Sequence, residues 1–440
     1  MEQLKEPPIG SLTARPESSL AWDNARHALI EGDNLDALHL LRASLTGAAH
    51  LIYVDPPYNN QRDLIYRDAT HAGDMRGALV AEQSVPASSQ SPRERWLSAL
   101  LPRLTLAREL LHEEGLIFLS IDDQELPTVR LLMDEIFGAE QRLATFIWET
   151  KRAARGVPPR SMVMSTHEYL LCYGRDQRCA RLAGLPRDAG DFHNPDNDPR
   201  GPWRSENITS TGRGGRQFSI VDPESGRSFE GRWAFSPERI AAMLEEGLIL
   251  FPRRANGVPR QKKLLSSYRN PRKAGTSMLG WHSTEQATKA LMRLFDGEKI
   301  FSYPKPQSLL RHILEQSCAA DDEALVLDLF AGSGSLAQAV IEHNRAAGSA
   351  LRSLSLQRPE PFNPERPSEA AAGRLCATLG VPATISALTG ERIRRVIMRR
   401  GTEALGAGEG LRSFQITRNP ESAPPSLFAD RTPTGENTDP

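Results

Sequence analysis

The tetrapeptide Asp55-Pro56-Pro57-Tyr58 brings together groups that could bind an aromatic amine. It follows the apolar run 51–54, which is typical of a buried strand. Two consecutive prolines cannot continue a hydrogen-bond ladder, so they end the strand and fix the backbone there. The Asp55 carboxylate and the Pro56 carbonyl could accept the two hydrogens of an exocyclic amine, and the Tyr58 ring could stack on the base. The alternative is a turn without chemistry, since Asp and Pro are common in turns.

Residues 325–335 form a second motif, Leu-Val-Leu-Asp-Leu-Phe-Ala-Gly-Ser-Gly-Ser, and an apolar helical pattern follows it. This order predicts a strand, a glycine-rich turn and a helix. Gly332 and Gly334 would let the backbone approach a ligand closely, and Ser335 could cap the helix. The third glycine of a dinucleotide fingerprint is missing from this motif, which argues against NAD.

Glu360 extends this motif towards a nucleoside site. It lies 26 residues after Gly334 and follows a candidate strand at 351–357, so its carboxylate could bind the two hydroxyls of a ribose. Together with the missing third glycine, this spacing favours a nucleoside ligand without a pyrophosphate, such as S-adenosylmethionine. A glycine turn without a ligand is the alternative.

In content and in order, these motifs resemble those of the β-class DNA amino-methyltransferases. The closest resemblance is to the modification (Mod) subunits of type III restriction systems and their solitary relatives. Segments similar to those of the family lie at 30–35, 55–59, 96–97, 115–123, 167–171, 301–306, 330–334 and 357–361. The resemblance implies methyl transfer from S-adenosylmethionine to an exocyclic amine of a base that has left the DNA duplex. It implies adenine N6 before cytosine N4, because the family's cytosine members more often have serine at the position of Asp55.

The resemblance also implies roles for individual residues. The catalytic set is Asp55, Pro56, Pro57 and Tyr58, and no metal is implied. The cofactor set is Asp33, Lys305, Asp328, Phe330, Gly332, Ser333, Gly334, Ser335 and Glu360. Asp33 and Lys305 enter this set through the resemblance alone, and for Asp33 the N-cap of a helix that begins before Leu35 is an equal alternative.

The charge of the chain is unevenly distributed. The net charge of the 440 residues is −1, yet residues 151–300 contain 26 Lys and Arg against 16 Asp and Glu. A basic segment in a neutral protein is typical of polyanion binding, although it can also be a solvated, loop-rich subdomain. The candidate DNA-binding residues in this segment are Lys151, Arg152, Arg213, Arg216, Arg253, Arg254, Lys262 and Lys263.

The sequence predicts an α/β fold with a doubly wound, Rossmann-like methyltransferase sheet, circularly permuted and carrying an inserted target-recognition domain. Strands are expected near 28–31, 51–54, 116–121, 144–149, 167–173 and 351–357, and helices at 96–112, 307–316, 335–344 and 384–400, with the charged run 391–395 exposed. The expected parts are a flexible N-terminus (1–20), the first part of the catalytic core (21–174), the basic target-recognition insert (175–300), the cofactor-binding part of the core (301–418) and a flexible tail (419–440). A polar loop is expected at 62–92.

Several classes of protein are disfavoured by composition. The chain is 39% hydrophobic and 25% charged, and no apolar run reaches the length of a membrane span. The N-terminus lacks the apolar stretch of a secretion signal, and the four cysteines form no metal-ligand spacing. We therefore expect a cytoplasmic enzyme that binds double-stranded DNA. A homodimer and a helicase-nuclease restriction subunit are possible partners, and a role as the specificity subunit for a separate nuclease is the alternative of a different class.

Overall fold

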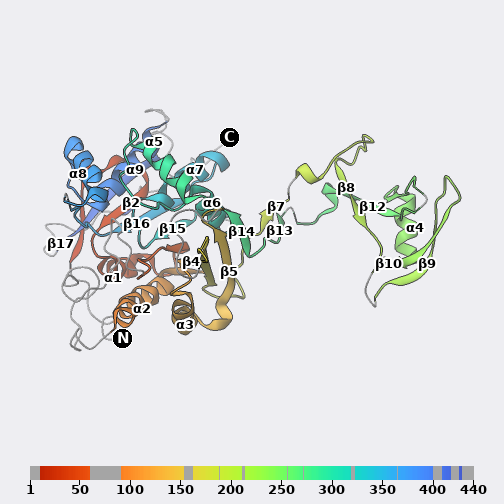
Figure 1. Cartoon of the computed structure of the whole chain (residues 1–440), viewed down its shortest axis with the longest axis horizontal. Coiled ribbons are helices and arrows are strands. Elements are labelled where there is room, and N and C mark those ends of the chain that lie inside the picture. Colours follow the sequence, from red (N-terminus) through yellow and green to blue (C-terminus); the bar gives the residue numbers. More distant parts are fainter. Residues whose placement is uncertain are drawn as a thin grey trace, which may run out of the picture. The chain divides into compact units, whose positions relative to one another are not determined.

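The computed structural model (Figure 1) describes residues 10–59, 91–152, 162–187, 189–210, 214–254, 256–270, 272–318, 323–363, 365–399, 409–417 and 426–428. Most of the expected polar loop at 62–92 therefore lies outside the described residues. The chain separates into two compact units. The first unit is formed by the residues up to Ala183 and from Thr276 onward, and the second by Gly184–Gly275.

The first unit is organised around one mixed sheet, which has ten strands among the described residues. Six neighbouring strands in its middle run parallel, and β6 is antiparallel to both of its neighbours. In sheet order the strands are β1 (Ser11–Ala14), β17 (Glu409–Thr417), β2 (Leu20–Glu31), β16 (Arg352–Gln357), β15 (Leu325–Asp328), β3 (Ala49–Val54), β4 (Leu111–Ile121), β6 (His167–Gly174), β5 (Arg142–Glu149) and β14 (Met278–Trp281).

Helices cover both faces of this sheet. Ile52 of β3 packs in one core cluster with Leu100 of α2, whereas its neighbour Leu51 packs in another with Leu310 of α6. Strands buried on both sides explain the unbroken apolar runs at 51–54 and 325–327. The doubly wound α/β fold is therefore confirmed. The helices are α1 (Asn34–Leu45), α2 (Pro92–Leu110), α3 (Leu126–Phe137), α5 (Thr284–Leu294), α6 (Gln307–Ser317), α7 (Ser335–Ala347), α8 (Pro367–Leu379) and α9 (Ile385–Met398).

The direction of winding reverses between β15 and β3. From β15 the chain passes through α7 to β16, on one side of the pair, while from β3 it reaches β4 on the other side after α2. The two strands are parallel neighbours, so their carboxyl ends meet at one edge of the sheet. Ligands in open α/β sheets bind at such a reversal point. Asp55 directly follows β3, and Asp328 is the last residue of β15.

The expectation of a flexible N-terminus over 1–20 was wrong for residues 11–14. These residues form β1, which pairs antiparallel with β17 near the other end of the chain. Of the expected flexible tail only 426–428 are described, and Phe428 is buried in the core of the first unit. Strand pairing between distant segments leaves no local sequence pattern, which explains why β1 and β17 were not expected.

The second unit, Gly184–Gly275, has a core of its own, centred on Trp233. It is narrower than the expected insert 175–300, because β14 joins the large sheet beside β5 and α5 contacts α9. The unit contains 16 Lys and Arg and 11 Asp and Glu. Its elements are β7 (Leu185–Pro186), β8 (Trp203–Asn207), β9 (Arg216–Val221), β10 (Ser228–Trp233), α4 (Pro237–Glu245), β11 (Ile249–Leu250), β12 (Arg260–Leu264) and β13 (Arg272–Lys273).

Within the described residues, no helix combines the length and the apolar character that crossing a membrane requires.

Candidate active site

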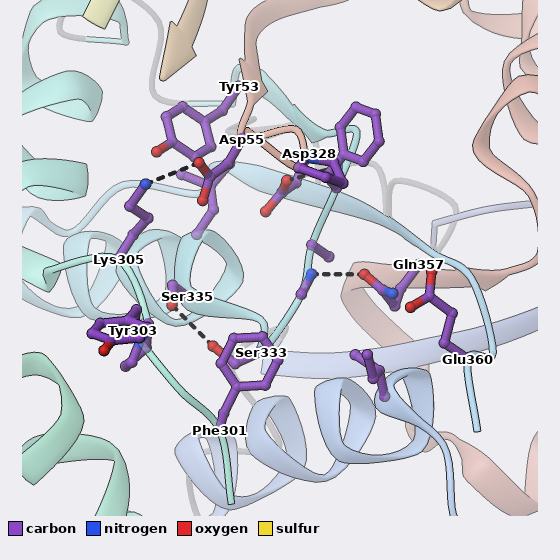
Figure 2. A pocket seen from close by; sticks show the side chains of 17 residues that line it. Tyr53, Asp55, Phe301, Tyr303, Lys305, Asp328, Ser333, Ser335, Gln357 and Glu360 are labelled. Atoms are coloured by element: carbon purple, nitrogen blue, oxygen red, sulfur yellow. Dashed lines mark hydrogen bonds and ion pairs between the residues drawn. The ribbon is translucent and has the colours of Figure 1, made fainter. Parts of the chain in front are cut away.

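A pocket of about 660 Å³, including the part open to solvent, lies at the carboxyl ends of β3 and β15. Most of its lining comes from the ends of these strands, the glycine turn, the start of α7 and the segment 301–305. In Figure 2, Asp55 and Lys305 lie on one side of the view with Ser335 and Ser333 below them, and Gln357 and Glu360 lie on the other side. The lining residues are Tyr53, Asp55, Pro57, Phe301, Tyr303, Pro304, Lys305, Asp328, Phe330, Ala331, Gly332, Ser333, Ser335, Leu336, Gln357, Glu360 and Ile385.

The fold thus brings residues of both sequence motifs to one pocket. Of the expected site residues, Asp55, Pro57, Lys305, Asp328, Phe330, Gly332, Ser333, Ser335 and Glu360 line it. Pro56, Tyr58 and Gly334 are next to these residues in the sequence but are not among the residues that line the pocket. Asp33 is outside the lining: it caps α1 by accepting from the Leu35 amide at 2.8 Å, and it pairs with Arg103 at 2.8 Å. The N-cap alternative for Asp33 is therefore the one observed.

Asp55 belongs to a cluster of four polar side chains. The Lys305 ammonium lies 2.9 Å from one Asp55 oxygen and 3.2 Å from the Glu168 carboxylate. The Tyr58 hydroxyl lies 3.0 Å from Asp55 and 3.2 Å from Glu168, and it also accepts from Lys305. Lys305 therefore bridges two carboxylates, of which Asp55 lines the pocket and Glu168 does not.

Within this cluster, Lys305 opposes the effect of burial on the pKa of Asp55. Burial raises the pKa of Asp55 and the Glu168 carboxylate adds to that rise, while Lys305 lowers it. Burial opposes the charge on Lys305, but the carboxylates of Asp55 and Glu168 outweigh burial and raise the pKa of the amine. Lys305 therefore stays protonated and favours the ionised form of Asp55, the form that accepts hydrogen bonds.

The backbone of the tetrapeptide is held from α2. The indole Nε1 of Trp96, a buried residue, donates to the Pro57 carbonyl at 2.7 Å. Within the described residues, the Pro56 carbonyl accepts no hydrogen bond. The arrangement leaves two acceptors, the Asp55 carboxylate and the Pro56 carbonyl, on a backbone that the prolines and Trp96 fix.

The glycine turn has the backbone conformation that its sequence predicts. Gly332 has φ +51° and Gly334 has φ +77°. Residues that carry a Cβ atom rarely adopt this backbone region. The Gly332 amide donates to the Gln357 side chain at 2.7 Å (Figure 2), and its carbonyl accepts from Thr389 at 2.6 Å. The expectation that Ser335 caps α7 was wrong: Gly334 is the N-cap, and Ser335 is the first residue of the helix.

Arg392 of α9 donates hydrogen bonds to the glycine turn. We expected the charged run 391–395 to be exposed, but Arg392 is 3% exposed. Its guanidinium donates to the Ser333 hydroxyl at 2.8 Å and to the Ser335 hydroxyl at 2.9 Å. It also donates to the Gln338 side chain at 2.8 Å. The run is charged in sequence, but α9 packs against α7, so one charge of the run faces inward.

Asp328 has the most perturbed carboxyl group of the pocket. Burial, reinforced by the nearby Asp55 charge, raises the pKa of Asp328 to about 8, although the Phe330 amide donates to it at 3.2 Å. The ligand-free pocket therefore favours a neutral Asp328 at pH 7. A cation bound beside it would reverse that preference.

The structure gives the candidate DNA-binding residues different surroundings. Lys151, Arg152, Arg216, Arg253 and Arg254 are exposed, and Arg213 lies outside the described residues. Lys263 is half-buried, with its ammonium over the Tyr268 ring at 4.9 Å.

Lys262, a candidate DNA-binding residue, is buried within the second unit. It is 4% exposed and pairs with Asp196 and Asp198 at 2.5 Å each. The pairing arises because the segment before β8 lies beside β12. The ammonium of Lys262 is therefore committed within the unit.

Two features of the site were missed from the sequence. Glu168 is the second residue of β6, and because β6 is antiparallel to β4, its first residues lie where the parallel strands end. A polar residue at the start of an apolar strand was the available signal. For Arg392 no signal was available. No group of three or more His, Cys, Asp or Glu residues that could hold a metal occurs in the described part of the chain.

Known proteins are similar in sequence to the chain. The "Type III restriction-modification enzyme StyLTI Mod subunit" of Salmonella typhimurium is 32% identical over 343 residues, 74% of this chain and 51% of that protein. The "Type II methyltransferase M.KpnI" of Klebsiella pneumoniae is 29% identical over 365 residues, 77% of this chain and 82% of that protein. The chain thus spans about half the length of the StyLTI Mod subunit.

Among solved structures, the PvuII DNA methyltransferase (cytosine-N4-specific) aligns with a TM-score of 0.41 and 11% identity, covering 86% of this chain and 95% of that one. A family model for N6 and N4 methyltransferases, described as "DNA methylase", matches residues 49–351. This match covers the Asp-Pro-Pro-Tyr motif, Glu168, Lys305 and the glycine turn. The chain therefore belongs to the DNA methylase family.

Proposed function

We propose that the protein transfers a methyl group from S-adenosylmethionine to the N6 amine of adenine in DNA. The observation that carries the proposal is the shared pocket: the Asp55 carboxylate, a hydrogen-bond acceptor for an amine, and the glycine turn line one cavity at the reversal point of the sheet. The membership of the DNA methylase family supports the same reaction.

The reaction requires the protein to activate a poor nucleophile. The lone pair of an aromatic amine is delocalised into the ring. Hydrogen bonds from the amine to Asp55 and to the Pro56 carbonyl favour the geometry in which the lone pair is localised on nitrogen. Because Lys305 lies 2.9 Å from Asp55 and favours its ionised form, the carboxylate accepts as the bond to carbon forms. This is preorganised electrostatic stabilisation combined with in-line positioning.

The proton lost from the methylated nitrogen also needs a destination. Asp55 accepts it directly. The Tyr58 hydroxyl, within hydrogen-bond distance of both Asp55 and Glu168, links this acid to a second carboxylate outside the pocket lining. The base must leave the duplex to reach Asp55, as base-modifying enzymes require.

The cofactor fits the remaining part of the pocket. When bound, S-adenosylmethionine supplies an electrophilic methyl group on a cationic sulfur. Glu360 would accept from the ribose hydroxyls, the turn 332–335 would surround the methionine portion, and Asp328 would face the cationic part.

Adenine is proposed before cytosine because an aspartate begins the tetrapeptide, where the family's cytosine members more often have serine. We also propose that the unit Gly184–Gly275 is a target-recognition domain and that the core into which it is inserted is circularly permuted. Its exposed residues Arg216, Arg253 and Arg254 suit contacts with phosphate or guanine. A homodimer and a helicase-nuclease subunit are the proposed partners, since similar proteins are named as subunits of restriction-modification enzymes.

The experiment that tests this function identifies the product. The purified protein is incubated with unmethylated bacterial genomic DNA and S-adenosylmethionine carrying a labelled methyl group, and the DNA is digested to nucleosides. The proposal predicts label in N6-methyldeoxyadenosine. Label in N4-methyldeoxycytidine would establish the cytosine alternative, and DNA without label, at a protein concentration that binds it, would contradict the proposal.

A further inference from the structure

One aromatic side chain of the pocket lining, Tyr303, is largely exposed. The aromatic residues that line the pocket are Tyr53, Phe301, Tyr303 and Phe330. Tyr53 and Phe301 are buried and Phe330 is half-buried, whereas Tyr303 is 65% exposed. A large exposed ring at the edge of a ligand pocket offers a flat surface that a planar ligand can cover.

The backbone at Tyr303 has a conformation that tyrosine rarely adopts. Its φ is +56°, in the left-handed region. A bulky residue at positive φ is an outlier, and such a conformation persists only where the surrounding structure imposes it. Here the segment is fixed on both sides, because Phe301 is buried in a core cluster and Lys305 pairs with Asp55 at 2.9 Å. Imposed strain of this kind is concentrated at ligand sites, so it favours a role for the ring in binding.

The same segment places Tyr303 on the side of the pocket where the amine would bind. Lys305, two residues further along the chain, contacts the Asp55 carboxylate. In Figure 2, Tyr303 lies on the same side of the view as Asp55 and Lys305, and Glu360 lies on the other side. The ring therefore belongs to the part of the pocket proposed for the base, not to the part proposed for the ribose of the cofactor.

Tyr58, the residue expected to stack on the base, already has contacts on one face of its ring. The Lys305 ammonium lies 4.8 Å from the centroid of that ring. The Tyr58 hydroxyl is within hydrogen-bond distance of Asp55 and Glu168. A base at Asp55 can therefore contact only the other face of Tyr58. A base that leaves the duplex loses the stacking partners on both of its faces, and enzymes that flip bases hold them between aromatic or apolar side chains.

We propose that Tyr303 is a substrate-contacting residue whose ring stacks on the flipped target base while Asp55 accepts the amine of that base. The inference rests on the proposed function, because it requires a base of DNA in the pocket. Stacking needs only a planar ring, so Tyr303 contributes affinity for the base without choosing adenine over cytosine.

Kinetics and calorimetry separate the two ligands of the pocket. With unmethylated bacterial genomic DNA as substrate, Tyr303→Ala should lower kcat/KM for DNA about fivefold to hundredfold, the range expected for the loss of one base–aromatic stack. The affinity for S-adenosylhomocysteine should change less than about twofold, because the ring does not contact the cofactor. Tyr303→Phe keeps the ring and should keep the wild-type kcat/KM, whereas Tyr303→Leu keeps apolar area without a ring and should lose activity.

Fluorescence reports the stacking itself. Sequencing of the methylated genomic DNA gives the target position, and a duplex is then made with 2-aminopurine there, a base whose emission is quenched when it stacks. The bound duplex should emit more strongly with Tyr303→Ala than with the wild type. Leu131→Ala changes an exposed apolar residue of α3 outside the pocket lining, and it should match the wild type in kinetics, calorimetry and emission.

The outcomes distinguish the inference from the function on which it rests. Wild-type kcat/KM and unchanged 2-aminopurine emission in Tyr303→Ala overturn the stacking role while the proposed function stands. A loss of S-adenosylhomocysteine affinity as large as the loss of kcat/KM also overturns it, because the ring would then contact the cofactor. A wild-type protein that methylates no DNA overturns the proposed function instead.

Discussion

The pKa of Asp328 predicts that cofactor binding is coupled to proton release. The ligand-free protein holds this carboxyl neutral up to about pH 8, because it is buried and lies near the Asp55 charge. S-adenosylhomocysteine brings an ammonium group into the pocket, and a nearby cation favours the ionised carboxylate. Binding at pH 7 should therefore release about one proton from Asp328.

The size of the effect follows from the linkage of one proton. Below about pH 8 the observed association constant should rise with pH by up to about tenfold per unit, so by up to about hundredfold between pH 6 and pH 8. The raised pKa of Asp328 also makes the stability of the ligand-free protein depend on pH. Between about pH 4 and pH 8 the folded protein keeps a proton that the unfolded chain loses, so this group makes stability fall as the pH rises.

Calorimetry in two buffers of different ionisation enthalpy, from about pH 6 to pH 8, counts the protons released by Asp328. Asp328→Asn should abolish the pH dependence of binding and raise the melting temperature of the ligand-free protein at pH 7. Asp123→Asn changes an exposed acid outside the pocket lining and should alter neither. Binding by the wild type that is independent of pH and exchanges no proton would refute the reasoning.

Three further predictions concern other residues. Lys305→Met should move the acid limb of the pH profile of the single-turnover rate to higher pH, and Glu168→Gln should move it to lower pH. The reason is that these two neighbours shift the pKa of Asp55 in opposite directions. Shifts of the acid limb in the same direction would contradict the role of the cluster. Gly332→Val should abolish S-adenosylhomocysteine binding in calorimetry, because φ +51° disfavours a branched side chain, and full affinity would make the turn irrelevant to the ligand. Lys262→Ala should lower the melting temperature of the protein, because it removes the partner of the Asp196 and Asp198 carboxylates, and an unchanged melting curve would argue against this pairing.

The core of the fold was predictable because its signals are local. Apolar runs at 51–54 and 325–327 become central strands buried on both faces, and the residues that follow them end at the ligand edge of the sheet. The prolines after Asp55 and the glycines after Asp328 are also local signals, since each restricts the backbone at its own position. The sequence therefore indicated both halves of the pocket.

The supporting residues were not predictable in this way, because their roles depend on packing between distant segments. Glu168 reaches Tyr58 and Lys305 because β6 lies antiparallel beside β4. Arg392 reaches the glycine turn because α9 packs on α7. Lys262 is buried because β12 pairs with β8, which places Asp196 and Asp198 beside it. A charged residue in a sequence gives no sign of which of these partners it will meet.

The most direct test of the central claim separates cofactor binding from methyl transfer at Asp55. Single-turnover transfer from labelled S-adenosylmethionine to DNA is measured for the wild type and for Asp55→Ala, with calorimetry of S-adenosylhomocysteine on both proteins. The account predicts a loss of at least about hundredfold in the transfer rate, because a transition-state contact is removed, with cofactor affinity largely retained. A variant that keeps more than about a tenth of the wild-type rate would contradict the assignment of Asp55 as the acceptor of the reacting amine.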